Sequence, residues 1–298
     1  MPRSPFGFVL PLLVSFAVAV PVALAPAAAD AKGRPTATKP AQPVHAHVLM
    51  DARTGRILES GNADVVTYPA SLAKMMTLLL TFEALDRGAL RLGQEVPVSH
   101  HAANQKPSRL NLVPGSAIKV EDAILALTVK SANDAAVVLA EAVGGNEKKF
   151  AEMMTAKARA LGMGNTTFRN ASGLPHSEQK TTARDMARLS RAVTNLPAQH
   201  YAYFGRTSFV WNGATVSGHN RLFGRVDGYD GIKTGFINTS GFNLAGSATR
   251  NGQRLIAVVL GGTTAAARDR EVAELLEKGF RALPAKQMAT AAGETTVR

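Results

Sequence analysis

Ser71 and Lys74 stand three residues apart at the start of a strongly apolar segment. On a helix, residues i and i+3 share one face, so these two side chains would lie within reach of each other. A serine hydroxyl is a poor nucleophile without a base, and lysine serves as that base when burial or a nearby cation lowers its pKa. The spacing therefore indicates a serine nucleophile with a lysine base. The same residues also fit a helix-capping serine beside a solvated lysine.

A second short motif, Ser131-Ala132-Asn133, falls between two apolar helical segments. At such a junction Ser131 can relay a proton to a departing amine, and Asn133 can hold a substrate amide and orient Lys74. A plain helix–helix turn with Asn133 or Asp134 as the N-cap fits these residues as well, and the two interpretations are compatible.

The third motif is Lys-Thr-Gly at residues 233–235, directly after a glycine-containing stretch. Its lysine can lower the pKa of Lys74 and attract a carboxylate, and its threonine can donate a hydrogen bond to that carboxylate. The backbone N–H groups of Phe236 and Ser71 can together form an oxyanion hole. Taken alone, the segment also fits an exposed edge strand with an incidental lysine. The occurrence of all three motifs in this order favours a catalytic role over a purely structural one.

Hydrophobic periodicity indicates which elements position the motifs. Helices are predicted at residues 72–86, 120–129, 134–142, 148–161, 184–193 and 266–283. Strands are predicted within 46–60, as strand, turn and strand, and at 208–216, 241–249 and 254–260, with an Asn251-Gly252 turn between the last two. This order predicts an α+β fold in which an antiparallel sheet is flanked by helices and the helical middle forms a second lobe.

Composition narrows the function further. Of 298 residues, 46% are hydrophobic and 19% charged, which excludes a disordered protein. The chain has no cysteine, which excludes disulfides, thiolate metal sites and a cysteine nucleophile. Its formal charge of +12 favours an anionic partner such as an envelope polymer or lipid head groups, although scattered solvated lysines and arginines explain the charge equally well.

The two ends of the chain differ from the rest. Residues 1–29 carry a positive start, an apolar run and a small-residue exit, which predicts a secretory signal peptide rather than an uncleaved membrane anchor. Residues 30–43 are rich in Ala, Lys and Pro and predict a flexible linker. Residues 284–298 form a polar tail without the apolar face that a C-terminal membrane anchor needs. The expected location is the periplasm.

Three longer stretches carry a family resemblance. PASLAKMMT at 69–77, SANDAAVVLAE at 131–141 and DGIKTG at 230–235 resemble the low-molecular-weight penicillin-binding proteins, the serine D-alanyl-D-alanine carboxypeptidases. Connecting segments such as FRNASGLP at 168–175 and LGGTT at 260–264 resemble the family too. The resemblance implies a β-lactamase/transpeptidase-like fold, with a serine D,D-peptidase catalytic domain over residues 44–283.

The resemblance also implies an activity and a set of site residues. The activity is removal of the terminal D-Ala from peptidoglycan stem pentapeptides through an acyl-enzyme on Ser71, with β-lactams as covalent inhibitors and neither a cofactor nor a metal. The implied catalytic residues are Ser71, Lys74, Ser131 and Asn133, and the implied substrate-binding residues are Lys233, Thr234, Gly235, Phe236 and Arg268. Arg268 also fits a solvated charge at a helix start. Phe236 stands where some relatives carry a polar residue.

The sequence leaves other functions open. Some short relatives are D,D-endopeptidases that cleave peptidoglycan cross-links, and a non-catalytic peptidoglycan-binding protein would keep the same fold. A class A β-lactamase needs a Glu-x-x-x-Asn loop. Glu178 is the one glutamate between Met153 and Asp227, and the residue four positions after it is Thr182 instead of Asn. A zinc peptidase is disfavoured because His45-x-His47 and His100-His101 fit a hydrated linker and loop. The signal peptide and the few aromatic residues disfavour nucleic acid as a partner.

Overall fold

The computed structural model describes residues 43–283, and a five-stranded antiparallel sheet organises them. Its strand order is β2–β1–β9–β8–β7, so β7 lies at one edge. The strands are β1 (Ala46–Asp51), β2 (Ile57–Gly61), β7 (Tyr229–Ile237), β8 (Gly241–Arg250) and β9 (Gln253–Gly262). Asn251 and Gly252, both at positive φ, form the predicted tight turn between β8 and β9.

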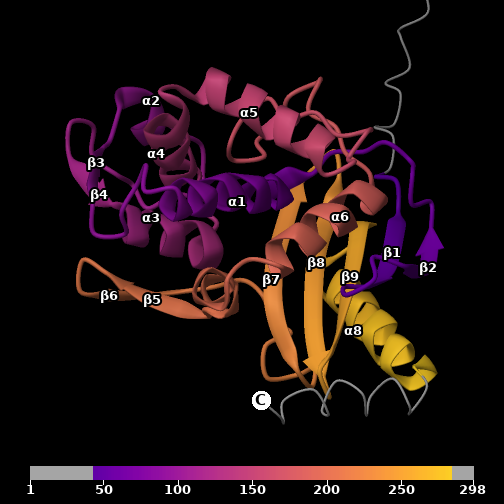
Figure 1. The fold of residues 1–298 in the computed structure, drawn as a ribbon. Coiled ribbons are helices and arrows are strands. Elements are labelled where there is room, and N and C mark those ends of the chain that lie inside the picture. The colour runs from indigo at the N-terminus through magenta and orange to yellow at the C-terminus, as the bar shows by residue number, and fades with distance from the viewer. Residues whose placement is uncertain (1–42, 284–298) are drawn as a thin grey trace, which may run out of the picture. The chain divides into compact units, whose positions relative to one another are not determined.

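Side-chain alternation along these strands builds two separate hydrophobic cores. On one face, Leu49 and Val259 pack with Val272, Leu276 and other apolar residues of α8 (Ala265–Ala282). On the other face, the neighbouring strand residues that point the opposite way, such as Val48 and Val258, pack with α1 (Ala73–Asp86) and α6 (Ala183–Thr194). Figure 1 shows α6 lying along the sheet and α8 beside β9.

The second part of the fold is mostly helical and lies beside the β7 side of the sheet (Figure 1). It contains α2 (His100–Ala103), α3 (Val120–Leu125), α4 (Asn133–Gly144), α5 (Glu147–Ala160) and the short pair β3 (Glu95–Pro97) and β4 (Ala117–Lys119). Helix α1 is apolar nearly all round and is buried, since it packs against α4 and α5 as well as α6. It therefore joins the helices to the sheet.

Two segments of the fold are irregular. Helix α3 continues into a π-helical turn, η2 (Ala126–Lys130), and ends at Ser131 in the left-handed conformation with φ 60°. After α7 (Ala198–Tyr201) and the 3₁₀ turn η3 (Ala202–Gly205), the strands β5 (Ser208–Trp211) and β6 (Ala214–Ser217) form a two-stranded hairpin. Within residues 43–283, no helix combines the length and apolar character that crossing a membrane requires.

The predicted α+β class and the predicted helices are confirmed. The single strand predicted over 208–216 is wrong, because Asn212 and Gly213 adopt positive φ and turn the chain back on itself. The interpretation of residues 233–235 as an exposed edge strand is only half correct: β7 is an edge strand, but the side chain of Lys233 is buried. The predicted signal peptide, nearly all of the linker and the polar tail lie outside the described residues.

The contact between α4 and α5 gives a test of the helical packing. A Cβ atom at Gly144 would lie 2.8 Å from Cβ and 3.0 Å from Cα of Phe150, neither of which can rotate away. Although alanine favours helices, Gly144→Ala should lower the free energy of unfolding by about 1–2 kcal/mol, because overpacking outweighs the propensity gain. Urea denaturation measures this.

Gly93→Ala is the matched control, because a Cβ there meets no heavy atom within 4 Å. It should leave the free energy of unfolding unchanged or slightly raised. Equal stability of the two variants would contradict the described packing of α4 on α5.

Candidate active site

Ser71 lies in a 3₁₀ turn, η1 (Ala70–Leu72), directly before α1. Its side chain makes no capping hydrogen bond, so the helix-cap interpretation is wrong. Two glycines let other segments approach its backbone closely. A Cβ at Gly173 would lie 1.8 Å from the carbonyl oxygen of Ala70, and a Cβ at Gly235 would lie 3.1 Å from the nitrogen of Ser71. The serine is therefore held between the 171–175 loop and β7.

Lys74 is the group that Ser71 faces. Its side chain is fully buried, and Nζ lies 3.1 Å from Ser71 Oγ, 2.7 Å from Asn133 Oδ1 and 2.5 Å from the carbonyl oxygen of Ser172. The latter two oxygens only accept hydrogen bonds, so they take both N–H groups of a neutral amine. The amine's lone pair then remains for the proton of Ser71. The partner set thus fits a lysine that acts as a base.

Electrostatics favours the same neutral form. Burial lowers the pKa of Lys74 well below its usual value, the charge of Lys233 lowers it further, and Asp134 opposes both effects. Burial, followed by the charge of Arg268, lowers the pKa of Lys233 to about 7. Lys233 Nζ donates to the carbonyl oxygen of Thr234 at 3.0 Å. The predicted influence of Lys233 on Lys74 acts in this direction and stays a prediction.

Asn133 is fixed by contacts at both ends of its amide. Oδ1 accepts from Lys74, and Nδ2 donates to the carbonyl oxygen of Lys106 at 2.8 Å. The next residue, Asp134, is fully buried and accepts from the backbone N–H groups of Leu110 and Leu112. Ala132, and neither Asn133 nor Asp134, occupies the N-cap position of α4, so the predicted cap is wrong. The start of α4 instead anchors a loop that borders the site.

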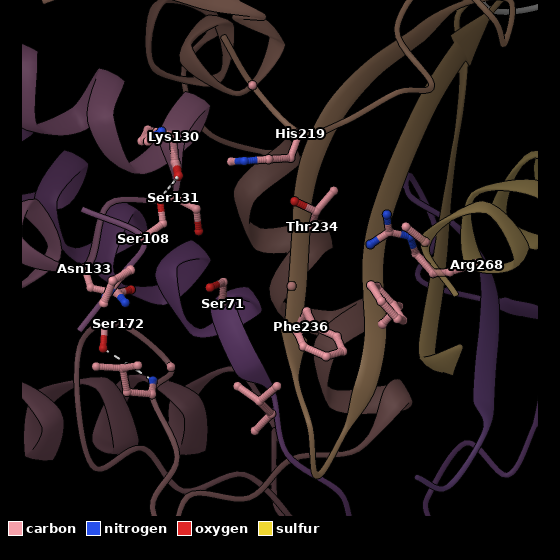
Figure 2. Close-up of a pocket in the computed structure, with 18 of the residues that line it drawn as sticks. Ser71, Ser108, Lys130, Ser131, Asn133, Ser172, His219, Thr234, Phe236 and Arg268 are labelled. Atoms are coloured by element: carbon pink, nitrogen blue, oxygen red, sulfur yellow. Dashed lines mark hydrogen bonds between the residues drawn. The ribbon is translucent and has the colours of Figure 1, made fainter. Parts of the chain in front are cut away.

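A cavity of about 490 Å³ opens above Ser71. Figure 2 shows Ser131 and Asn133 on the helical side and Thr234 and Phe236 on the strand side, with Ser71 between them. The remaining lining residues include Gly235 and Arg268. The structure thus gathers the predicted site residues around one cavity. Lys74 and Lys233 are the exceptions, because both are buried behind its wall.

Two predicted residues have distinctive surroundings. Ser131 Oγ is buried, lines the cavity and has no hydrogen-bond partner among the described residues, which leaves it available to a ligand. Arg268 is only 4% exposed and donates from Nη1 to the carbonyl oxygen of Asn243 and from Nε to Asp269. The interpretation of Arg268 as a solvated charge is therefore wrong.

Sequence reasoning missed several residues of the site. Ser172 supplies a carbonyl oxygen to Lys74, and the segment around it was recognisable only as text shared with a family. Lys130, His219 and Arg221 also line the cavity, and Lys130 and Arg221 add positive charge to it. Burial, with Lys233 and other nearby cations, lowers the pKa of His219. No spacing in the sequence marks these three residues.

Carboxylates are absent from the cavity wall as far as residues 43–283 define it. Glu178, the glutamate considered for a β-lactamase-type base, has a side chain that is 64% exposed and pairs with Arg169. Glu178 therefore does not act as the water-activating carboxylate that a class A β-lactamase needs.

The fold and the Ser71–Lys74 arrangement are those expected of active-site-serine proteins in which a lysine activates the nucleophile. The model of the family described as D-alanyl-D-alanine carboxypeptidase matches residues 34–264. The chain belongs to that family.

Curated relatives agree with this assignment. The chain is 37% identical over 253 residues to D-alanyl-D-alanine carboxypeptidase DacC of Escherichia coli, covering 83% of this chain and 63% of that protein. It is 33% identical over 241 residues to DacF of Bacillus subtilis, covering 78% and 61%. The chain therefore spans a little over three fifths of the length of these two relatives.

Solved structures confirm the predicted β-lactamase/transpeptidase-like fold. DacD of Francisella tularensis matches with a TM-score of 0.77 at 32% identity, covering 85% of this chain and 74% of that one. Penicillin-binding protein 6B of Escherichia coli matches with a TM-score of 0.75 at 34% identity, covering 83% and 80%. A penicillin-binding protein of Listeria monocytogenes in its ampicillin-bound form matches with a TM-score of 0.68 at 32% identity, covering 79% and 96%.

The contacts of Lys74 generate a direct test. Lys74→Ala removes the proton acceptor of Ser71, so covalent labelling of Ser71 by a fluorescent penicillin should slow by about 100-fold or more. Lys148→Ala removes an exposed lysine of α5 and should label at the normal rate. Circular dichroism and cooperative unfolding establish that both variants are folded. Labelling of a folded Lys74→Ala variant at the normal rate would reject lysine as the base.

Proposed function

We propose that the protein is a serine D-alanyl-D-alanine carboxypeptidase that removes the terminal D-Ala from peptidoglycan stem pentapeptides. The observation that carries this proposal is the buried Lys74 amine, whose Nζ lies within hydrogen-bonding distance of Ser71 Oγ, Asn133 Oδ1 and the Ser172 carbonyl oxygen. Membership of the D-alanyl-D-alanine carboxypeptidase family supports the choice of substrate.

Acylation would begin as Lys74 takes the hydroxyl proton of Ser71 while Oγ attacks the carbonyl carbon of the penultimate D-Ala. The negative charge that develops on the carbonyl oxygen is assigned to the backbone N–H groups of Ser71 and Phe236. Ser131, whose Oγ is free of protein partners among the described residues, relays a proton to the departing amine. Terminal D-Ala leaves, and water then hydrolyses the acyl-enzyme.

The strand side of the cavity would recognise the free carboxylate of the substrate. Thr234 and Arg268 line this side, and Lys233 supplies positive charge from behind it. Gly235 lets β7 lie against Ser71, which keeps the carboxylate subsite close to the nucleophile. β-Lactams carry a carboxylate near a reactive amide, so they would enter the same way and acylate Ser71.

The proposed setting is the periplasm. Residues 1–29 would direct export as a signal peptide, residues 30–43 would act as a linker, and peptidoglycan would be the partner. The excess of positive charge suits an anionic cell-wall substrate.

A mixture of pentapeptide monomers and D-alanyl cross-linked dimers tests the activity, with mass spectrometry of the products. We expect loss of one alanine from the pentapeptides with the native chain and none with Ser71→Ala. Conversion of dimers to monomers would reassign the protein as a D,D-endopeptidase. A folded native chain that gives no product would reject turnover and favour a peptidoglycan-binding role.

The pKa shifts predict a bell-shaped pH profile for kcat/KM. Activity should rise with pH as Lys74 becomes neutral, and it should fall as pH rises through about 7, where Lys233 loses the charge that attracts the carboxylate. Lys233→Arg keeps its charge, so the alkaline fall should disappear.

The matched control is the same peptide with a C-terminal carboxamide, which offers no carboxylate to Lys233. Its kcat/KM should be lower and should lack the alkaline fall in the native chain. The same alkaline fall with both peptides would show that Lys233 does not act through the carboxylate.

A further inference from the structure

A second polar cluster lies away from the catalytic cavity, between the start of β1 and α8. His47 lies on β1 opposite Gly61 of β2, and its side chain is only 22% exposed. A Cβ at Gly61 would lie 2.6 Å from Cε1 of the His47 ring, so the glycine makes room for the imidazole. The expectation that His45 and His47 are residues of a hydrated linker is therefore wrong for His47.

Three possible ligand groups meet at this place. His45 Nε2 lies 2.8 Å from Glu271 Oε2, and His47 Nδ1 lies 3.7 Å from Glu271 Oε1. One ligand atom from each of the three residues lies within 4.8 Å of the other two. His45 precedes β1 and Glu271 belongs to α8, so the cluster joins two segments that are far apart in sequence (Figure 1).

The surroundings of His47 give an independent indication of a ligand. Nδ1 is buried and has no hydrogen-bond partner among the described residues, although it points toward Glu271. On the other side of the ring, Nε2 lies 4.0 Å from Glu59 Oε1, and Lys278 holds that carboxylate at 2.7 Å. Metal-binding imidazoles commonly have one nitrogen on the metal and a carboxylate behind the other. Glu59 occupies the corresponding place behind His47, at a distance longer than a hydrogen bond, and Nδ1 is left for a ligand.

We propose that His45, His47 and Glu271 bind a divalent metal ion of the zinc class. Two imidazoles and one carboxylate are donors that suit Zn²⁺, whereas Mg²⁺ and Ca²⁺ prefer oxygen ligands. Tetrahedral bonds of about 2.0–2.1 Å place ligand atoms roughly 3.4 Å apart. The two imidazoles approach different oxygens of Glu271, at 2.8 and 3.7 Å, and one ligand atom from each residue lies within 4.8 Å of the other two, so small side-chain rotations would bring them to this spacing. Water would complete the coordination, because the half-exposed His45 side chain leaves the site open to solvent.

The bound ion would act on structure rather than on the acyl transfer. None of its three ligands lines the catalytic cavity, so it differs from the zinc of a zinc peptidase. It would tie the segment that enters β1 to α8, one helical turn beyond Arg268. The ion would therefore stabilise the half of α8 that carries this arginine. The proposal is independent of the proposed peptidase activity.

Metal binding is tested on the full chain, purified without a histidine tag and stripped with a chelator. Isothermal titration with Zn²⁺ should show one ion per chain, and saturating Zn²⁺ should raise Tm by about 5 °C or more. His47→Gln and Glu271→Gln should each weaken binding by about tenfold or more and abolish the Tm rise. Mg²⁺ should change neither quantity.

His101→Gln is the matched control, because His101 pairs with Glu147 at 2.6 Å but belongs to no three-ligand cluster within residues 43–283. This variant should bind Zn²⁺ like the native chain. Metal-free Tm values establish that each variant is folded, and the visible spectrum of Co²⁺ reports tetrahedral coordination in the native chain. Absence of saturable Zn²⁺ binding, or equal binding by the native chain and Glu271→Gln, would overturn the proposal and leave the cluster as an ion pair.

Discussion

The burial of a single amine dominates this structure. Lys74 is fully buried, so an ammonium group there would lose its hydration, and no carboxylate of the described residues contacts Nζ directly to compensate. Such a group lowers its pKa and gives up its proton. The neighbouring charge of Lys233 acts in the same direction. A residue that is cationic on a protein surface is thereby shifted toward its neutral form, which is the form that the proposed base needs.

Much of the local architecture serves this amine. The 171–175 loop must approach α1 closely enough to bring the carbonyl of Ser172 to Nζ, and Gly173 permits that approach because it has no Cβ. Asn133 must present its oxygen and not its amide nitrogen, and the carbonyl of Lys106 enforces this by accepting from Nδ2. Asp134 secures the same loop from inside the fold. Unusual backbone positions, such as the close approach at Gly173 and the left-handed Ser131, thus lie next to the candidate active site.

The sequence predicted the elements and the paired motifs well because both depend on local spacing. Ser71 and Lys74 needed only a helix to meet, and the hydrophobic periodicity supplied that helix. The Ser172 carbonyl could not be predicted in this way, since a backbone oxygen carries no side-chain signature and reaches Lys74 only through tertiary folding. The positions of His219 and Arg221 could not be predicted either, since these side chains reach the cavity only through tertiary folding. The turn at Asn212-Gly213 was detectable, but the apolar residues on both sides resembled one strand. His47 was misjudged because its packing depends on Gly61, which follows it by fourteen residues.

The two hydrophobic cores on opposite faces of the sheet have a consequence for how the protein can vary. Ser71 and Lys74, the proposed nucleophile and base, lie against the core formed by α1, α4 and α6, whereas Arg268 belongs to α8, whose apolar residues form the other core. A substitution in the core under α8 would displace Arg268, which is proposed to bind the substrate carboxylate, more than it would displace Ser71. Substrate anchoring and serine activation thus depend on packing in different cores, and the charge of Arg268, acting through Lys233 on Lys74, is what still couples them.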